Sequence, residues 1–158
     1  MHFAQVALAW IGPAYLLAVS LPLAIIDIRQ RRLPNRLVLP GLAITLLAHV
    51  SAVLFGAEWA RMLTAWLTAT LVFALAAFAN YFGALGMGDV KLMALMTAAL
   101  SWFGWQHPLI AFAVAFVLAT VGVLVLFVAR RAKLGSTVAL GPYLLAGFAV
   151  AATGLAWS

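Results

Sequence analysis

The chain has 158 residues, of which 68% are hydrophobic and only 8% are charged. Soluble domains carry about 25% charged residues, so this composition excludes water as the main solvent of the protein surface. The apolar stretches approach the roughly 20 residues that a helix needs to cross about 30 Å of hydrocarbon. They are near-continuous, unlike the alternating strands of a membrane barrel. The sequence therefore predicts an all-α, polytopic membrane protein of one domain with about six transmembrane helices.

The net charge of +6 is spread over short basic clusters beside the apolar segments. Such clusters usually orient helices and contact anionic lipid, which argues against a nucleic-acid partner. Cysteine is absent, which excludes a disulfide, a thiolate metal site and a cysteine nucleophile. No His/Glu spacing resembles a zinc site, and His49 is interpreted as a packing residue. We therefore expect neither a metal nor a cofactor.

The predicted helices are separated by polar or glycine-rich breaks. They cover residues 3–26, 37–55, 59–78, 90–103, 109–128 and 138–157. The apolar run of the first helix has no Lys or Arg before it, so we expect it to be retained rather than removed as a signal peptide. Residues 27–36 are polar and basic and indicate a loop. Residues 80–89 contain Gly83, Gly86 and Gly88, which favour an interruption with close backbone approach.

Positive charge is held on the cytoplasmic side of membrane proteins, so the distribution of Lys and Arg predicts the orientation. Eight of the nine fall on alternate junctions between the predicted helices. They are Arg29, Arg31, Arg32, Arg36, Lys91, Arg130, Arg131 and Lys133. Arg61 falls on the opposite side. We therefore expect both termini outside the cytoplasm, with Asp27 and Asp89 sharing the cytoplasmic face.

The two aspartates of the chain both lie at predicted helix boundaries on this face. An ionisable group in a membrane helix costs about 2.5 to 3.5 kcal/mol, so it is a functional hypothesis by default. One interpretation is that both are hydrated and pair with Arg29 and Lys91. The other is that they approach each other and share one proton. The ionised member could then deprotonate water while the protonated member polarises a peptide carbonyl.

Three segments carry a family resemblance. Residues 86–89 (Gly-Met-Gly-Asp) resemble the Gly-x-Gly-Asp signature of membrane aspartyl proteases, and their Val-Lys-Leu continuation resembles the type IV prepilin peptidases specifically. Asp27 and residues 31–35 resemble the first catalytic segment of that family. Residues 139–143 resemble its Gly-Pro-aromatic motif. The three motifs stand in family order over nearly the whole chain, which makes the resemblance specific.

The resemblance implies an endopeptidase that removes the leader of type IV prepilins or pseudopilins at the cytoplasmic face of the inner membrane. Asp27 and Asp89 would be the catalytic pair, with prepilin leaders and membrane lipids as partners. Longer members add a cysteine-rich insertion associated with methylating the new amino terminus. The absence of Cys and the short first loop resemble the compact Flp/Tad-pilus type, without N-methyltransferase activity.

Further residues in these segments are candidates for substrate binding or for shaping the site. They are Gly86, Gly88, Lys91, Arg31, Pro34, Asn35, Gly141, Pro142 and Tyr143. The glycines could admit a substrate strand or simply pack helices. Lys91 could orient a substrate group or extend to the interface. Gly141 and Pro142 could form a flexible break or a kink.

Two other functions are compatible with parts of the sequence. Paired membrane carboxylates, broken helices and glycines also build proton-coupled transporters. Against this, both aspartates lie at predicted helix ends rather than near the midplane, and the chain shows no internal repeat. A non-catalytic pilus-assembly subunit would keep the fold, but the presence of both aspartates argues against it.

Overall fold

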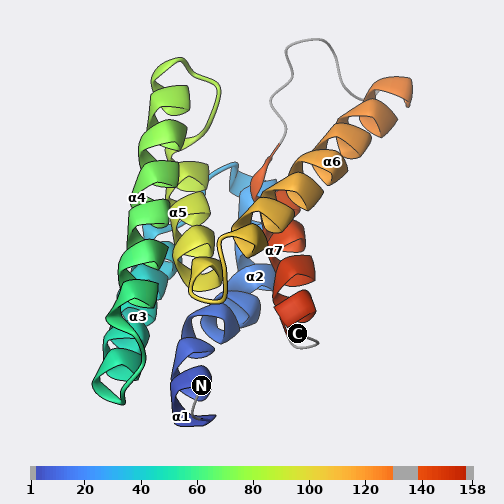
Figure 1. The fold of residues 1–158 in the computed structure, drawn as a ribbon. Helices are drawn as coiled ribbons and strands as arrows, with labels where there is room; N and C mark the ends of the chain where they lie inside the picture. The colour runs from blue at the N-terminus through green and yellow to red at the C-terminus, as the bar shows by residue number, and fades with distance from the viewer. Residues whose placement is uncertain (1–2, 130–138, 156–158) are drawn as a thin grey trace.

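The computed structural model describes residues 3–129 and 139–155. Within these ranges the regular structure is entirely helical (Figure 1). The helices are α1 (Phe3–Ala9), α2 (Ile11–Gln30), α3 (Asn35–Leu54), α4 (Trp59–Tyr81), α5 (Met87–Ser101), α6 (Gln106–Val128) and α7 (Gly141–Leu155). The predicted positions 138, 156 and 157, and the charged residues Arg130, Arg131 and Lys133, lie outside the described ranges.

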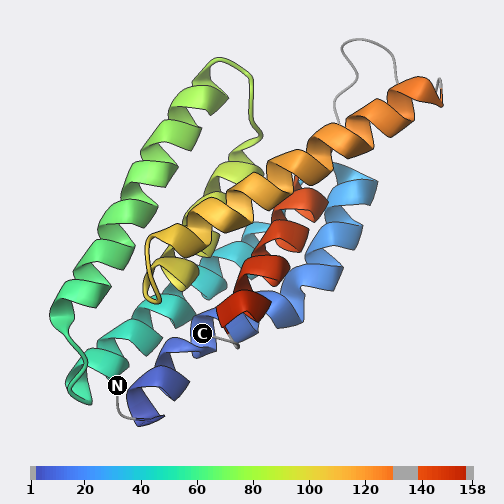
Figure 2. The same ribbon diagram turned by 45° about the vertical axis from the view of Figure 1, so that its right-hand side comes forward.

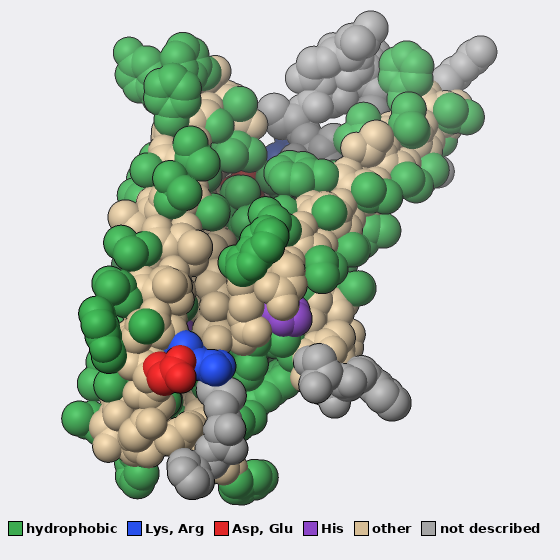
Figure 3. All heavy atoms as spheres, in the orientation of Figure 1, with side chains coloured by type: hydrophobic (Ala, Val, Ile, Leu, Met, Phe, Trp, Pro, Cys, Tyr) green, Lys and Arg blue, Asp and Glu red, His purple; other side chains and the backbone are tan. Residues whose placement is uncertain are grey.

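Four stretches are long and apolar enough to cross a membrane: Phe3–Gln30, Asn35–Leu54, Trp59–Tyr81 and Gln106–Val128. The first combines α1 and α2, which meet at a turn at Trp10. Apolar side chains cover the visible faces of α4 and α6, as a surface in contact with lipid requires (Figure 3). The prediction of an all-α, polytopic membrane protein is therefore confirmed.

Successive helices from α2 onward run in opposite directions (Figures 1 and 2). The end of α2, the start of α3, the end of α4 and the start of α5 consequently lie at one end of the bundle. The end of α6 and the start of α7 lie at this end too. Asp27 and Asp89 belong to helix termini in this group, so we name it the aspartate end. Helix α1 begins and α7 finishes toward the opposite end.

Helix α5 is the most enclosed part of the bundle. All residues from Leu92 to Ser101 are buried, whereas α6 buries only Pro108, Ala111 and Ala115. The large side chains of α5 join one core with residues of α2 and α7. In a bilayer this association depends on close packing, because lipid tails are as apolar as the core. The packing fixes the height and rotation of α5, and with them the position of its first turn.

Small residues allow the shorter helix α7 to approach α6 closely. A Cβ added to Gly147 would overlap the carbonyl oxygen of Ala111 and lie 2.9 Å from the Ala115 Cβ. Small-residue contacts of this kind are common between membrane helices, since they bring the backbones together. They hold α7 at a fixed depth, so the beginning of α7 is also positioned.

Several helix ends differ from the predictions, and three of these differences bear on the site. Helix α2 continues to Gln30, so Asp27 lies in its last turn and not in a loop. Helix α5 begins at Met87, so Asp89 belongs to its first turn and not to the preceding break. Helix α7 begins at Gly141, so the Gly-Pro pair opens a helix instead of bending one. Pro is compatible with a first helical turn, where its missing N–H has no helical partner to lose.

Candidate active site

Asp27 is held at the point where α2 ends. Arg31 caps the helix in the left-handed region, with φ of 51°, and its backbone N–H donates to the Asp27 carbonyl oxygen at 2.7 Å. The Asp27 side chain is only 4% exposed. Its Oδ2 accepts a hydrogen bond from the Gly141 backbone N–H at 3.0 Å. The first catalytic candidate is therefore fixed between the last turn of α2 and the first turn of α7.

The beginning of α7 explains why Gly141 makes this contact. Pro142 has no N–H, and the N–H groups of Tyr143 and Leu144 both donate to the Leu140 carbonyl oxygen at 3.1 Å. The Gly141 N–H remains available to a group outside the helix. A Cβ on Gly141 would lie 2.5 Å from the Asp27 Oδ2. Position 141 therefore has no room for a side chain while Asp27 keeps its place.

Asp89 lies three residues after Gly86, the N-cap of α5. At this position an acidic side chain can fold back toward the N-cap backbone, where the helix dipole favours negative charge. A Cβ on Gly86 would lie 3.1 Å from the Asp89 Oδ2. The glycine thus leaves space for the carboxyl group over the start of its own helix.

Asp89 lies outside the four long apolar helices, and its surroundings favour its protonated form. Burial is the largest cause, and the nearby charge of Asp27 adds to it. Together they raise the pKa of Asp89 to about 6, although a hydrogen bond with the Gly86 backbone acts in the opposite direction. A carboxyl group with a pKa near neutrality can both hold and release a proton under physiological conditions.

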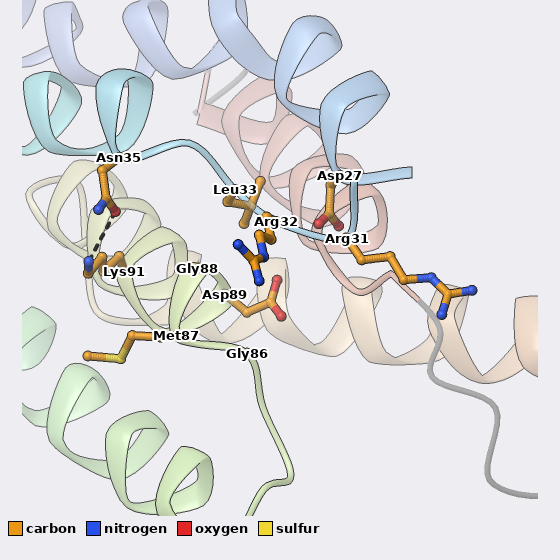
Figure 4. Close-up of a pocket in the computed structure, with 10 residues that line it drawn as sticks. All are labelled: Asp27, Arg31, Arg32, Leu33, Asn35, Gly86, Met87, Gly88, Asp89 and Lys91. Atoms are coloured by element: carbon orange, nitrogen blue, oxygen red, sulfur yellow. Dashed lines mark hydrogen bonds between the residues drawn. The ribbon is translucent and has the colours of Figure 1, made fainter. Parts of the chain in front are cut away.

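Two contacts attach the connection between α2 and α3 to the start of α5. A Cβ on Gly88 would lie 2.9 Å from the Leu33 Cβ and 3.2 Å from the Leu33 backbone nitrogen. Lys91 Nζ donates a hydrogen bond to Asn35 Oδ1 at 3.0 Å (Figure 4). These contacts hold residues 31–35 against α5 and thereby set the distance between the two aspartate-bearing helices.

Two adjoining cavities open at the aspartate end. The first has a volume of about 400 Å³ and is lined by Asp27, Arg31, Arg32, Leu33, Asn35, Gly86, Met87, Gly88, Asp89 and Lys91. The second, of about 510 Å³, is lined by Asp27, Arg31, Gly83, Ala84, Leu85, Gly86, Asp89, Ala139 and Leu140. Both cavities include Asp27 and Asp89, whose carboxyl groups face a common space from α2 and α5 (Figure 4). A water molecule and a peptide bond brought into this space would meet both carboxyl groups.

The structure brings together most, but not all, of the residues singled out from the sequence. Those that line the first cavity are Asp27, Arg31, Asn35, Gly86, Gly88, Asp89 and Lys91. Gly141 reaches the site through its backbone. Pro34, the N-cap of α3, and Pro142 line neither cavity. Tyr143 also lines neither, because its hydroxyl packs where a Cβ on Gly122 of α6 would lie.

Other lining residues were not singled out from the sequence. Three of them lie inside the motif segments 31–35 and 86–89: Arg32, Leu33 and Met87. Their position within these segments could have identified them as site residues. Residues 83–85 line the second cavity. Apart from Gly83, nothing in their sequence indicates a functional site. Across residues 3–129 and 139–155, no three His, Asp or Glu side chains gather as a metal site would require.

The fold and site define a class of protein: a polytopic membrane protein with a pair of carboxyl groups in a cavity at one end of its helix bundle. Residues 14–128 match the type IV leader peptidase family, and the chain belongs to that family. The resemblance described from the sequence motifs is therefore confirmed. The Gly-Pro motif of residues 139–143 lies beyond the matched range.

One relative is a prepilin leader peptidase/N-methyltransferase from Pseudomonas putida. It is 33% identical to this chain over an alignment of 132 residues that covers 78% of this chain and 43% of the relative. The chain thus spans less than half the length of that protein. No solved structure was found to match the chain.

Proposed function

We propose that this protein is a membrane aspartyl endopeptidase that removes the leader peptide of type IV prepilins or related pseudopilins. The observation that supports this most directly is the placing of Asp27 and Asp89 on a shared pair of cavities. Membership of the leader peptidase family supports the substrate class. The position of both aspartates at the end of the bundle, beside these cavities, favours peptide hydrolysis over a transport site buried halfway along the helices.

In the proposed mechanism the two carboxyl groups share one proton and water is the nucleophile. The ionised carboxylate accepts a proton from water while the oxygen of that water bonds to the scissile carbonyl carbon. The protonated carboxyl group gives its proton to the carbonyl oxygen, which forms a neutral tetrahedral diol. The carboxyl group that took the proton from water then gives it to the leaving amine. As the C–N bond breaks, the other carboxylate takes a proton from one hydroxyl of the diol, which becomes the new carboxylic acid. Each turnover returns the pair to its starting protonation state.

The neighbouring residues would shape the site around this pair. Arg31, Lys91 and Asn35 lie in the cavity wall and are proposed to orient the substrate backbone. Gly86 and Gly88 are proposed to let the substrate or the 31–35 segment approach α5 closely. Pro34, Pro142 and Tyr143, which line neither cavity, are proposed to hold the beginnings of α3 and α7 in place.

We propose further that the enzyme is of the compact Flp/Tad-pilus type and does not methylate its product. The support is the absence of cysteine from the chain and the short connection between α2 and α3, residues 31–34. The relative from Pseudomonas putida has both activities in its name, so the point needs a direct measurement.

The proposed orientation places the aspartate end at the cytoplasmic face of the inner membrane and both termini on the other side. In the described ranges, Arg29, Arg31, Arg32, Arg36 and Lys91 belong to this end, and Arg61 starts α4 at the other. Reporter fusions test the orientation, with a cytoplasmic signal expected at Arg32 and a non-cytoplasmic signal at Glu58. The reverse pattern would place the aspartates in the wrong compartment and overturn the proposal.

The function is tested by incubating the purified protein in detergent with a Flp-type prepilin and measuring leader loss by mass spectrometry. We expect one cut, a product with a free amino terminus, and cleavage that survives chelators and reagents against serine and thiol groups. Activity that disappears with a chelator and returns with zinc would show that the aspartates bind a metal. A product carrying an added methyl group, when methyl donor is supplied, would contradict the single-activity proposal.

A further inference from the structure

The surroundings of Asp27 contain two features that oppose a negative charge on its carboxyl group. The residue lies in the last turn of α2, where the helix dipole presents its negative end. Its side chain is also 4% exposed, so an anion there would have little hydration. Without a compensating contact, Asp27 would be the member of the pair that takes the proton.

The compensating contact comes from α7. Its Gly141 N–H donates to the Asp27 Oδ2 at 3.0 Å, at the positive end of the dipole of a 15-residue helix. A backbone N–H at a helix N-terminus stabilises the anionic form of the oxygen that it faces. Because Pro142 has no N–H and the next two are engaged with Leu140, the first turn of α7 directs the Gly141 donor to Asp27.

Asp89 depends on the charge of its partner. It lies at the start of its own helix, where the dipole favours a negative charge, but burial and then the negative charge of Asp27 raise its pKa. A second negative charge in the same space is therefore unfavourable. Because α7 stabilises the negative charge on Asp27, the single proton of the pair is more stable on Asp89.

We propose that Gly141 is a positioning residue: when the pair holds one proton, its backbone N–H keeps Asp27 ionised, so that Asp27 is the base toward water and Asp89 carries the shared proton. The base and acid roles rest on the proposed peptidase function, but the resting distribution of the proton does not. The other charged side chains that line these cavities are Arg31 and Arg32 after α2 and Lys91 of α5. Helices α3, α4, α6 and α7 contribute no charged residue to the described lining of either cavity.

The chain contains only two aspartates, which permits a direct test. Protein labelled with ¹³C at the aspartate carboxyl carbon gives two such resonances, which Asp27→Asn and Asp89→Asn assign. On acidification we expect the Asp89 resonance to carry most of the first protonation step. The amide proton of Gly141 should shift mainly in the second step, when Asp27 takes up its proton. A first step carried mostly by Asp27, with the Gly141 amide moving alongside, would overturn the proposal.

A variant tests the positioning role of Gly141. In Gly141→Ala the new Cβ would lie 2.5 Å from the Asp27 Oδ2, so the carboxyl group must move away from the N–H. We expect the first protonation step to shift from Asp89 toward Asp27. Gly154→Ala in the same helix is the matched control, because a Cβ there meets no atom within 4 Å. An unchanged proton distribution in folded Gly141→Ala would refute the positioning role.

A failure of the proposed peptidase function can be distinguished from a failure of the Gly141 proposal, because the titration uses no substrate. If the protein is not a peptidase, the asymmetry between the resonances persists while no prepilin is cut. If Gly141 does not hold the charge, prepilin is cut but the asymmetry is absent. Should Gly141→Ala fail to fold, the titration of the unaltered protein still decides the proposal.

Discussion

The two ends of the bundle both carry carboxyl groups, but in opposite surroundings. Where α4 begins, the Glu58 side chain is 75% exposed and its Oε2 accepts a hydrogen bond from Arg61 Nε at 3.4 Å. At the aspartate end, Asp27 is 4% exposed and shares its cavities with Asp89. An exposed ion pair of this kind contributes about 0–1 kcal/mol to stability. Two carboxyl groups withdrawn from water around one space can instead exchange a proton.

The difference shows that the surroundings of an acidic residue, more than its presence, indicate a chemical role. His49 is a second example of a residue whose surroundings indicate its role. His49 is fully buried, as expected for a packing residue, and its ring stacks on Trp102 with centroids 4.4 Å apart. It lines neither of the two cavities that contain the aspartates.

The comparison is tested most severely by removing one acidic group at a time. Asp27→Asn or Asp89→Asn should each lower the cleavage rate by about 100-fold or more, because general acid–base groups contribute about 10² to 10⁴. The double variant should be no slower than the single variants, since the two groups act as a unit. Glu58→Gln should leave cleavage near normal. A folded, membrane-inserted Asp89→Asn protein with normal turnover would mean that the aspartates are structural.

A smaller loss is expected when only the distance between the aspartate-bearing helices changes. In Gly88→Ala the added Cβ meets Leu33 at 2.9 Å, so the 31–35 segment must move away from α5. Displacements approaching 1 Å at a catalytic site can cost up to about 100-fold, and we expect about 10-fold in kcat. Gly154→Ala, at the other end of the bundle, should have no effect. Equal rates for the two variants would show that the Gly88 contact does not set the site.

Stability should respond to Asp89 in the opposite direction from activity. Its pKa is raised to about 6 in the folded protein, above the roughly 4 of an unfolded chain. The unaltered protein therefore loses stability as the pH rises from about 4 to 6. Asp89→Asn removes this loss, so it should gain about 1 kcal/mol at pH 7 after allowance for partial solvent exposure, and nothing at pH 4. Thermal unfolding in detergent at both pH values measures the difference, and a gain that is equal at the two pH values would contradict this assignment.

The smallest effect is expected for the hydrogen bond between Lys91 and Asn35. Because the contact is exposed, a double-mutant cycle with Lys91→Met and Asn35→Ala should give a coupling of about 0.5 to 1 kcal/mol in unfolding. Cleavage should fall only a few-fold in each single variant. A coupling near zero would leave the Gly88 contact as the principal link between α5 and the 31–35 segment.

Much of the architecture could be predicted because the relevant signals are local. The apolar runs are long, and the alternation of helix direction places every second junction at the same end. This alternation is sufficient to bring Asp27 and Asp89 to one face without any knowledge of packing. The position of Asp27 within a helix was missed because α2 ends on Arg31 in the left-handed region, where glycine is the usual signal for a helix end.

The contacts that complete the site could not be predicted, because they join residues distant in the chain. Gly141 and Asp27 are 114 positions apart in the chain. The sequence of the Gly-Pro pair does not indicate which carboxyl group accepts the hydrogen bond from the Gly141 N–H. Tyr143 belongs to the same motif, yet it packs against Gly122 of α6 and away from the cavities. Two positions in the chain thus separate a residue of the site from a residue that packs the helices.

The shortness of α5 and α7 bears on how the protein would sit in a bilayer. Each has 15 residues and is therefore about 22 Å long, less than the roughly 30 Å of hydrocarbon in a typical bilayer. Helices α4 and α6, with 23 residues each, are long enough to span the full thickness. Because α5 is enclosed by other helices, the hydrophobic mismatch falls on α7. Thinning of the lipid beside α7 would bring headgroups and water toward its first turn, where Gly141 meets Asp27. The proposed hydrolysis at the aspartate end would then draw its water from a local depression of the membrane surface.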